Sequence, residues 1–178
     1  MAQLTLDQLR FPIGPFERKE IYTDADLAEM LQTIAAAPAQ YRQIAAGLSP
    51  GDFQKTYRPG AWTIAQLLHH IADTQLLHYL RLKKTVTEPT GGEVTMIDID
   101  AWANTPDATQ APVADSLDLL ESVVKKYLYL ARTLNEAQRM KSNFHPVRGY
   151  TINADQIVAM SAWHLLHHLK HIEIALEG

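Results

Sequence analysis

Cysteine is absent from this chain. Disulfide bonds, thiolate ligands and a cysteine nucleophile are therefore excluded, and any metal ion must be held by histidine, aspartate or glutamate. The sequence also lacks a run of about 18 apolar residues, which argues against a membrane-spanning helix. Its first residues lack the basic start and apolar stretch that are typical of a signal peptide, so we expect a cytoplasmic protein.

A large excess of charge is also lacking. The net charge is −4, so the composition predicts no basic surface for nucleic acid. The hydrophobic content of 47% and the charged content of 20% are ordinary for a globular protein. A length of 178 residues fits one fold with a sizeable core, and we expect residues 1–178 to form a single domain.

Four long segments have helical periodicity and polar residues that are typical of helix starts. The first begins after Thr23 and ends near Ala46, although Pro38 is expected to kink or break it. The second follows Thr63, which forms a capping-box pair with Gln66, and is expected to end near Lys83 or Lys84. The third covers about 113–134, and the last follows a cap at Asn153 and continues to residue 177.

The remaining segments predict loops and short elements. Residues 1–22 are expected to be mostly extended, 85–113 to form a long connection, and 143–152 to form a loop or small hairpin. Four long helices and the absence of a clear series of strands predict an all-α fold, a four-helix bundle. The long connection favours a crossover within the bundle rather than a simple up-and-down order.

Histidines are concentrated near the end of the chain. Four of the eight occur within residues 163–171, on one face of the predicted last helix: His164, His167, His168 and His171. Three apolar residues continue the same face: Ile157, Met160 and Ala175. A core face of this kind leaves the imidazoles in need of hydrogen-bond partners, and a transition metal ion can meet this need. A core histidine without a metal is the ordinary alternative.

The second predicted helix carries His69, His70 and His78. His69 and His70 lie on opposite flanks of its apolar stripe, and periodicity does not choose between them. Asp73, one turn after His70, could orient a ligand imidazole, although an exposed carboxylate is the more common role.

Three other polar residues are candidates for the surface. Arg81 and Arg148 could bind an anionic substrate, but solvated charges are the ordinary expectation. His145 lies in a predicted loop, and we expect it to be solvated as well.

Several motifs together resemble the DinB superfamily, in its YfiT-like branch of metal-dependent hydrolases. They are Phe11-Pro12-Ile13-Gly14, Arg58-Pro59-Gly60, the segment from Trp62 to Asp73, and Trp163-His164-Leu165-Leu166-His167-His168. The resemblance covers essentially the whole chain. It implies one divalent ion, zinc or nickel, per chain, held by His70, His164 and His168, with water in the fourth position. It also implies a homodimer and a small-molecule substrate, and leaves His69, His167 and His171 as supporting groups.

Two reactions remain open under this resemblance: hydrolysis by an activated water, or transfer of a low-molecular-weight thiol, as in other branches of the superfamily. A non-catalytic metal-binding or stress-response module is the alternative. Other zinc signatures are missing, because Leu165 follows His164 where HExxH requires glutamate, and zinc deaminases require cysteine.

Overall fold

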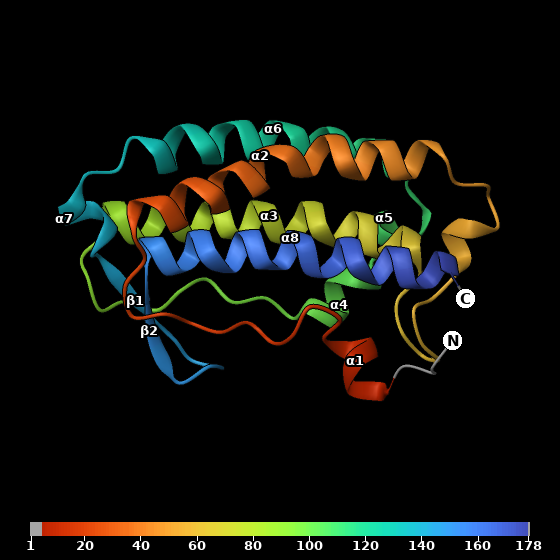
Figure 1. Cartoon of the computed structure of the whole chain (residues 1–178), viewed down its shortest axis with the longest axis horizontal. Helices are drawn as coiled ribbons and strands as arrows, with labels where there is room; N and C mark the ends of the chain where they lie inside the picture. The colour runs from red at the N-terminus through yellow and green to blue at the C-terminus, as the bar shows by residue number, and fades with distance from the viewer. Residues whose placement is uncertain (1–4, 178) are drawn as a thin grey trace.

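The computed structural model describes residues 5–177 and is built on four long helices. They are α2 (Asp24–Ala46), α3 (Ile64–Thr87), α6 (Val113–Arg132) and α8 (Ala154–Glu177). They lie side by side along the length of the molecule (Figure 1). The predicted all-α four-helix bundle is confirmed. Within residues 5–177, none of the helices combines the length and the apolar character needed to cross a membrane.

The order of the helices around the bundle differs from their order in the chain. Helix α3 packs against α6 and α8, and α2 packs against the same two helices, so α2 and α3 lie diagonally across the bundle. Helices α3 and α6 run in the same direction, whereas α2 and α8 run in the opposite one (Figure 1). Because α3 and α6 are parallel neighbours, the chain between them must return along the bundle. This return is the predicted crossover.

Hydrogen-bonded caps fix where the two histidine-bearing helices begin. At α3, the Thr63 hydroxyl accepts from the Gln66 amide at 3.2 Å, and Oε1 of Gln66 accepts from the Thr63 amide at 3.0 Å. Asn153 and Gln156 form the same reciprocal pair at α8, at 2.9 and 3.0 Å. Such caps satisfy amides that lack partners within the helix, and each contributes about 1 kcal/mol. The predicted starts of both helices are therefore confirmed.

Three local expectations need correction or detail. Residues 11–22 lie outside helices and strands, in keeping with the expected mostly extended start, but a capping box between Thr5 and Gln8 adds a short helix, α1 (Leu6–Arg10). Of the two effects expected of Pro38, a break is excluded, because α2 is continuous from Asp24 to Ala46. Helix α3 continues past Lys84 to Thr87, where the Thr87 hydroxyl donates to the Lys83 carbonyl oxygen at 2.7 Å.

Short elements surround the bundle. They are the 3-10 helix η1 (Asp52–Gln54), α4 (Ile99–Ala103), α5 (Pro106–Gln110), α7 (Glu136–Arg139), and the strands β1 (Ser142–His145) and β2 (Tyr150–Asn153). The strands form an antiparallel hairpin in which Ser142 pairs with Asn153 and His145 with Tyr150. The crossover connection is attached to this hairpin, because the Val94 amide donates to the Phe144 carbonyl oxygen at 2.9 Å. The hairpin and the connection thus cover one side of α3 and α8 (Figure 1).

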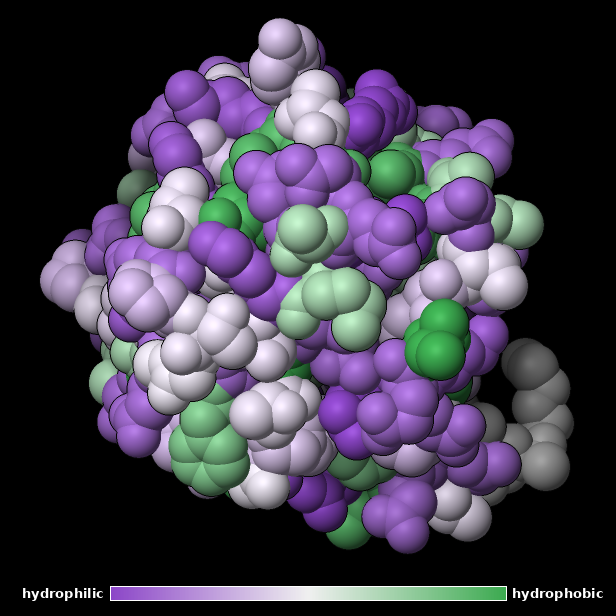
Figure 2. Space-filling model, turned by 90° about the vertical axis from the view of Figure 1, so that its left-hand side faces the viewer, coloured by the Kyte–Doolittle hydropathy of each residue, from purple (hydrophilic) through white to green (hydrophobic). Residues whose placement is uncertain are grey.

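The core lies between the four helices. Its fully buried side chains include Leu67, Leu68 and Ile71 of α3 and Ile157 and Leu165 of α8. Burial of each such side chain contributes about 1.5–3 kcal/mol to folding. At the end of the molecule that holds α7, hydrophobic residues appear as separate spots among hydrophilic ones (Figure 2). The helix faces that carry the histidines border this core, since His70 and His168 are buried beside it.

Candidate metal centre

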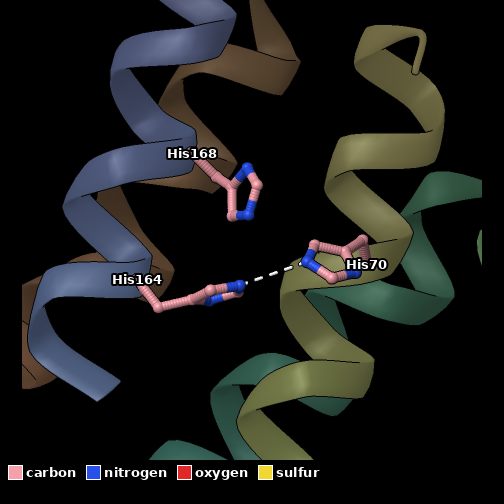
Figure 3. A group of neighbouring side chains, drawn as sticks. All are labelled: His70, His164 and His168. Carbon is pink, nitrogen blue, oxygen red and sulfur yellow. Dashed lines mark hydrogen bonds between the residues drawn. The ribbon is translucent and has the colours of Figure 1, made fainter. Parts of the chain in front are cut away.

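Three histidines from two neighbouring helices point toward one another inside the bundle (Figure 3). His70 comes from α3, and His164 and His168 come from successive turns of α8. Each offers a ring nitrogen, and these nitrogens all lie within 4.8 Å of one another. The residues that the family resemblance implies as ligands are thus brought together.

The spacing of the nitrogens fits a metal ion. Nε2 of His70 and Nε2 of His164 are 3.1 Å apart. Two imidazole ligands at the usual zinc distance and tetrahedral angle place their nitrogens roughly 3.3 Å apart. An i, i+4 pair on a helix facing a single ligand on another helix is a common way to build such a site. The donor set and its spacing therefore suit a divalent ion.

Burial keeps the three imidazoles neutral. His70 and His168 are buried and His164 is partly buried. Burial lowers the pKa of His70 to about 4. Burial, followed by the neighbouring histidines, lowers the pKa values of His164 and His168 well below the usual value. Neutral imidazole is the form that binds a metal ion, so these ligands need no deprotonation at neutral pH.

A chain of hydrogen bonds determines which nitrogen of His168 is free. Nε2 of His171 lies 3.0 Å from the carbonyl oxygen of Leu9, which can only accept, so this nitrogen carries the proton. The unprotonated Nδ1 of His171 then accepts from Nδ1 of His168, 3.3 Å away. Nε2 of His168 is left with a free lone pair. Residues beyond the triad of His70, His164 and His168 thus leave Nε2 of His168 available to an ion.

A second group of histidines has the spacing of a metal site but fits one less well. Its members are His167, His168 and His171, whose ring nitrogens also lie within 4.8 Å of one another. Both ring nitrogens of His171 already form hydrogen bonds within the chain. A ligand role therefore suits the first group better than the second.

Aromatic rings and one hydroxyl surround the triad. Trp62 contacts His70 with ring centroids 4.6 Å apart, and Tyr57 stacks on His171 at 3.8 Å. The Thr74 hydroxyl lies 3.4 Å from Nδ1 of His70. Asp73 was a candidate for this position, but among the described residues His70 has its contact with Thr74 and no hydrogen bond with Asp73. Tyr57 and Thr74 were missed because nothing in the sequence pattern distinguishes them from ordinary packing residues.

The triad opens onto a cavity of about 490 Å³. Segments far apart in the sequence line it, including Phe11, Arg58, Trp62, Asp100 and Trp163. A cavity of this volume is large enough for a small organic molecule. The arrangement can therefore expose a bound ion to a ligand from one side.

His69, which precedes His70 on α3, lies outside the group of three. Nδ1 of His69 is 2.8 Å from the Ser116 hydroxyl of α6, so His69 faces the opposite neighbour of α3. Asp73 is partly buried, and its pKa is raised by burial and by the negative charge of Asp107. Neither side chain belongs to the group of three.

Two expectations of solvent exposure were wrong. His145 is only 5% exposed, because it lies on β1 where the hairpin packs against the bundle. Arg81 is only 7% exposed, because the crossover connection covers it. Arg148 is exposed as expected, with its guanidinium 5.8 Å from the centre of the Phe16 ring.

Known proteins share both the sequence and the shape of this chain. A family model of the DinB superfamily matches residues 33–172. A protein of Oceanobacillus iheyensis with the name "Putative metal-dependent hydrolase OB0413" is 40% identical over 172 residues, which cover 96% of each chain.

Among solved structures, YfiT from Bacillus subtilis superposes with a TM-score of 0.90 and 29% identity, over 96% of this chain and 97% of that one. It is described as "a probable metal-dependent hydrolase with an unusual four-helix bundle topology". A mycothiol-dependent maleylpyruvate isomerase superposes with a TM-score of 0.64 and 17% identity, over 88% of this chain and 70% of that one, a likeness of fold alone. The sequence matches and the shared helix arrangement together show that this chain belongs to the DinB superfamily.

Proposed function

We propose that this chain is a metal-dependent enzyme in which His70, His164 and His168 hold one divalent ion, zinc or nickel, and act on a small-molecule substrate. The observation that carries the proposal is the convergence of the three neutral imidazoles at a cavity of about 490 Å³. A site intended only for structure is usually closed by a fourth protein ligand. Within the described residues, the group that contains His70 consists of three histidines, and no aspartate or glutamate joins it as a fourth ligand.

The chain's own residues prepare the site for chemistry. His171, fixed by the Leu9 carbonyl oxygen, holds His168 in the tautomer that presents Nε2. The indole rings of Trp62 and Trp163 line the cavity and give it apolar walls beside the triad. When bound, a divalent ion with three neutral ligands supplies Lewis-acid activation, because it lowers the pKa of a coordinated water or thiol toward neutrality.

Between the two reactions, we place more weight on transfer of a low-molecular-weight thiol than on hydrolysis, the activity that appears in the names of the relatives at 29–40% identity. Asp100 is the carboxylate on the described lining of the cavity, and it is exposed rather than held as a buried base. A thiol brings its own nucleophilic sulfur and depends less on such a base. The mycothiol-dependent isomerase with this fold is, by its name, thiol-dependent. A second cavity also reaches His164, so two molecules can approach the same residue.

Turnover assays test the proposal. The zinc-loaded and nickel-loaded proteins are incubated with a panel of low-molecular-weight thiols and chlorodinitrobenzene, and separately with chromogenic esters and amides. We expect thiol-dependent turnover that is lost in His168→Ala and retained in His69→Ala, since His69 contacts Ser116 and not the triad. Turnover without thiol, lost in the same variant, supports hydrolysis instead. A fully metallated protein that turns over neither class is the result expected of a non-catalytic metal-binding or stress-response module, and would refute the enzyme proposal.

Four further expectations stay predictions. They are the choice between zinc and nickel, the homodimer, the cytoplasmic location and the single domain formed by residues 1–178. Elemental analysis of the purified protein and its sedimentation in solution test the first two directly.

A further inference from the structure

A second cavity, of about 300 Å³, also reaches His164. It is enclosed by α3, α8, the crossover connection and the hairpin, which contribute Leu77, Met96, Val147 and Met160 among its apolar residues. Trp163, His164 and Ile99 line both this cavity and the one at the triad. The two cavities therefore meet beside the proposed metal ligand.

The polar residues of this second cavity are basic or neutral. Its lining contains two guanidinium groups, those of Arg81 and Arg148, and three imidazoles, those of His78, His145 and His164. No aspartate or glutamate is found among the described residues that line it. The cavity consequently combines positive charge with apolar walls.

Arg81 is the central group of this arrangement. It is 7% exposed, and within residues 5–177 it forms no ion pair with a carboxylate. Its Nε donates to the Thr95 carbonyl oxygen at 2.9 Å, and one Nη lies 3.5 Å from the Met96 sulfur. A buried guanidinium normally has an anionic partner, because removal of a charge from water is costly. Here the acceptors that the described residues supply are neutral.

Neighbouring groups add to the need for an anion. Burial and the positive charge of Arg148 lower the pKa of Arg81 to about 10, so Arg81 is still protonated at neutral pH. The Nδ1 atoms of His78, His145 and His164 are buried and lack a hydrogen-bond partner among the described atoms. Two cations and three imidazoles without a carboxylate favour a ligand that only accepts hydrogen bonds.

We propose that this cavity binds the carboxylate of the substrate, and that the substrate is a small organic acid whose apolar body lies against Leu77, Met96 and Met160. The inference deepens the proposed function, on which it rests for the identity of the site beside it. Arg81 provides a planar pair of donors that matches a carboxylate, and Arg148, which is exposed, adds a second guanidinium to the lining. A carboxylate held in this cavity orients the reactive part of the acid toward His164. Binding energy from a part of the substrate that does not itself react then contributes to the rate.

Saturation-transfer NMR with two matched probes tests this assignment. Phenylacetate carries the charge, whereas phenylacetamide has the same shape without it. We expect the zinc-loaded protein to bind phenylacetate, and to bind the amide at least about tenfold more weakly, since a hydrogen-bonded charge contributes more than a neutral group. Arg81→Met should weaken phenylacetate binding by a similar factor, and Arg148→Met by a smaller one. Arg132→Met removes an exposed guanidinium of α6 outside the cavity and should have no effect.

Removal of the metal separates this proposal from the preceding one. A carboxylate held by Arg81 should still bind the chelated protein, whereas a carboxylate that only ligates the ion should not. Failure of the chain to bind zinc would refute the proposed function and leave this measurement valid. Equal binding of the two probes, unchanged binding in both Arg81→Met and Arg148→Met, or loss of binding on chelation would each overturn the assignment. Where Arg81→Met does not fold, as judged by circular dichroism, Arg81→Lys and Arg148→Met decide the question.

Discussion

Acid should unfold the metal-free protein at a pH where carboxylates are still ionised. Burial lowers the pKa of His70 to about 4 and, together with Arg81, that of His78 to about 3. A histidine in the unfolded chain titrates near 6.5. Between about pH 6.5 and 4 the unfolded chain therefore binds protons that the folded chain excludes, and the free energy of unfolding falls as the pH is lowered.

The magnitude follows from the depth of burial. For His70, a shift of roughly 2.5 pH units corresponds to about 3 kcal/mol between neutral pH and pH 4. The pKa values of His78, His164 and His168 are lowered too, so their contributions have the same sign. A domain of this size has a total stability of about 5–15 kcal/mol, and a few such histidines suffice to unfold it. Asp26, whose pKa is lowered to about 2 mainly by the Thr23 hydroxyl, loses its contribution only below this range.

Urea unfolding of the chelated protein at several pH values between 7.5 and 5, followed by circular dichroism, measures this dependence. The matched variant is His78→Leu, because His78 is 2% exposed and lies outside the triad. Its loss should make the dependence shallower by one proton, about 1.4 kcal/mol per pH unit. A free energy of unfolding that stays constant between pH 7.5 and 5 would refute the argument, since it would mean that the buried imidazoles take up protons freely.

Three further predictions concern the metal. His70→Ala should abolish stoichiometric zinc binding, measured by elemental analysis after dialysis, whereas His69→Ala should retain it; the reverse outcome would show that the wrong histidine of α3 has been chosen. A chelator should lower the melting temperature at neutral pH, because the ion binds the folded chain preferentially; equal melting temperatures, with the metal shown to be removed, contradict the site. His171→Phe should weaken zinc affinity by about 10–100-fold in competition with a chromogenic chelator, because Nδ1 of His168 loses its acceptor; unchanged affinity refutes the role given to His171.

Local signals predicted the helices that hold the site, because those signals act over three or four residues. The Thr63–Gln66 pair and the Asn153–Gln156 pair define where α3 and α8 begin, and each involves only neighbours in sequence. Once the start of α8 is known, His164 and His168 must lie one above the other on the same face. The resemblance to a known family then added His70, which periodicity alone did not select.

Periodicity did not distinguish His69 from His70 because α3 has two packed neighbours. Helix α3 contacts α6 on one side and α8 on the other. His69 faces α6, where it meets Ser116, and His70 faces α8, where it meets His164. Both side chains are therefore buried, and the pattern of apolar residues is the same for either role. Only the order of helices around the bundle, which depends on the crossover, separates them.

The support of the triad comes from contacts that no local pattern contains. The carbonyl oxygen of Leu9, on the short helix α1, sets the tautomer of His171. The two residues are 162 positions apart in the sequence. Because His171 in turn sets His168, the backbone at the beginning of the chain determines which lone pair faces the proposed ion. A backbone carbonyl has no residue type to recognise, so sequence alone gives no sign of it. The segment from Thr5 to Phe11 is consequently a support of the proposed site, because its Leu9 carbonyl oxygen holds His171, which in turn orients His168.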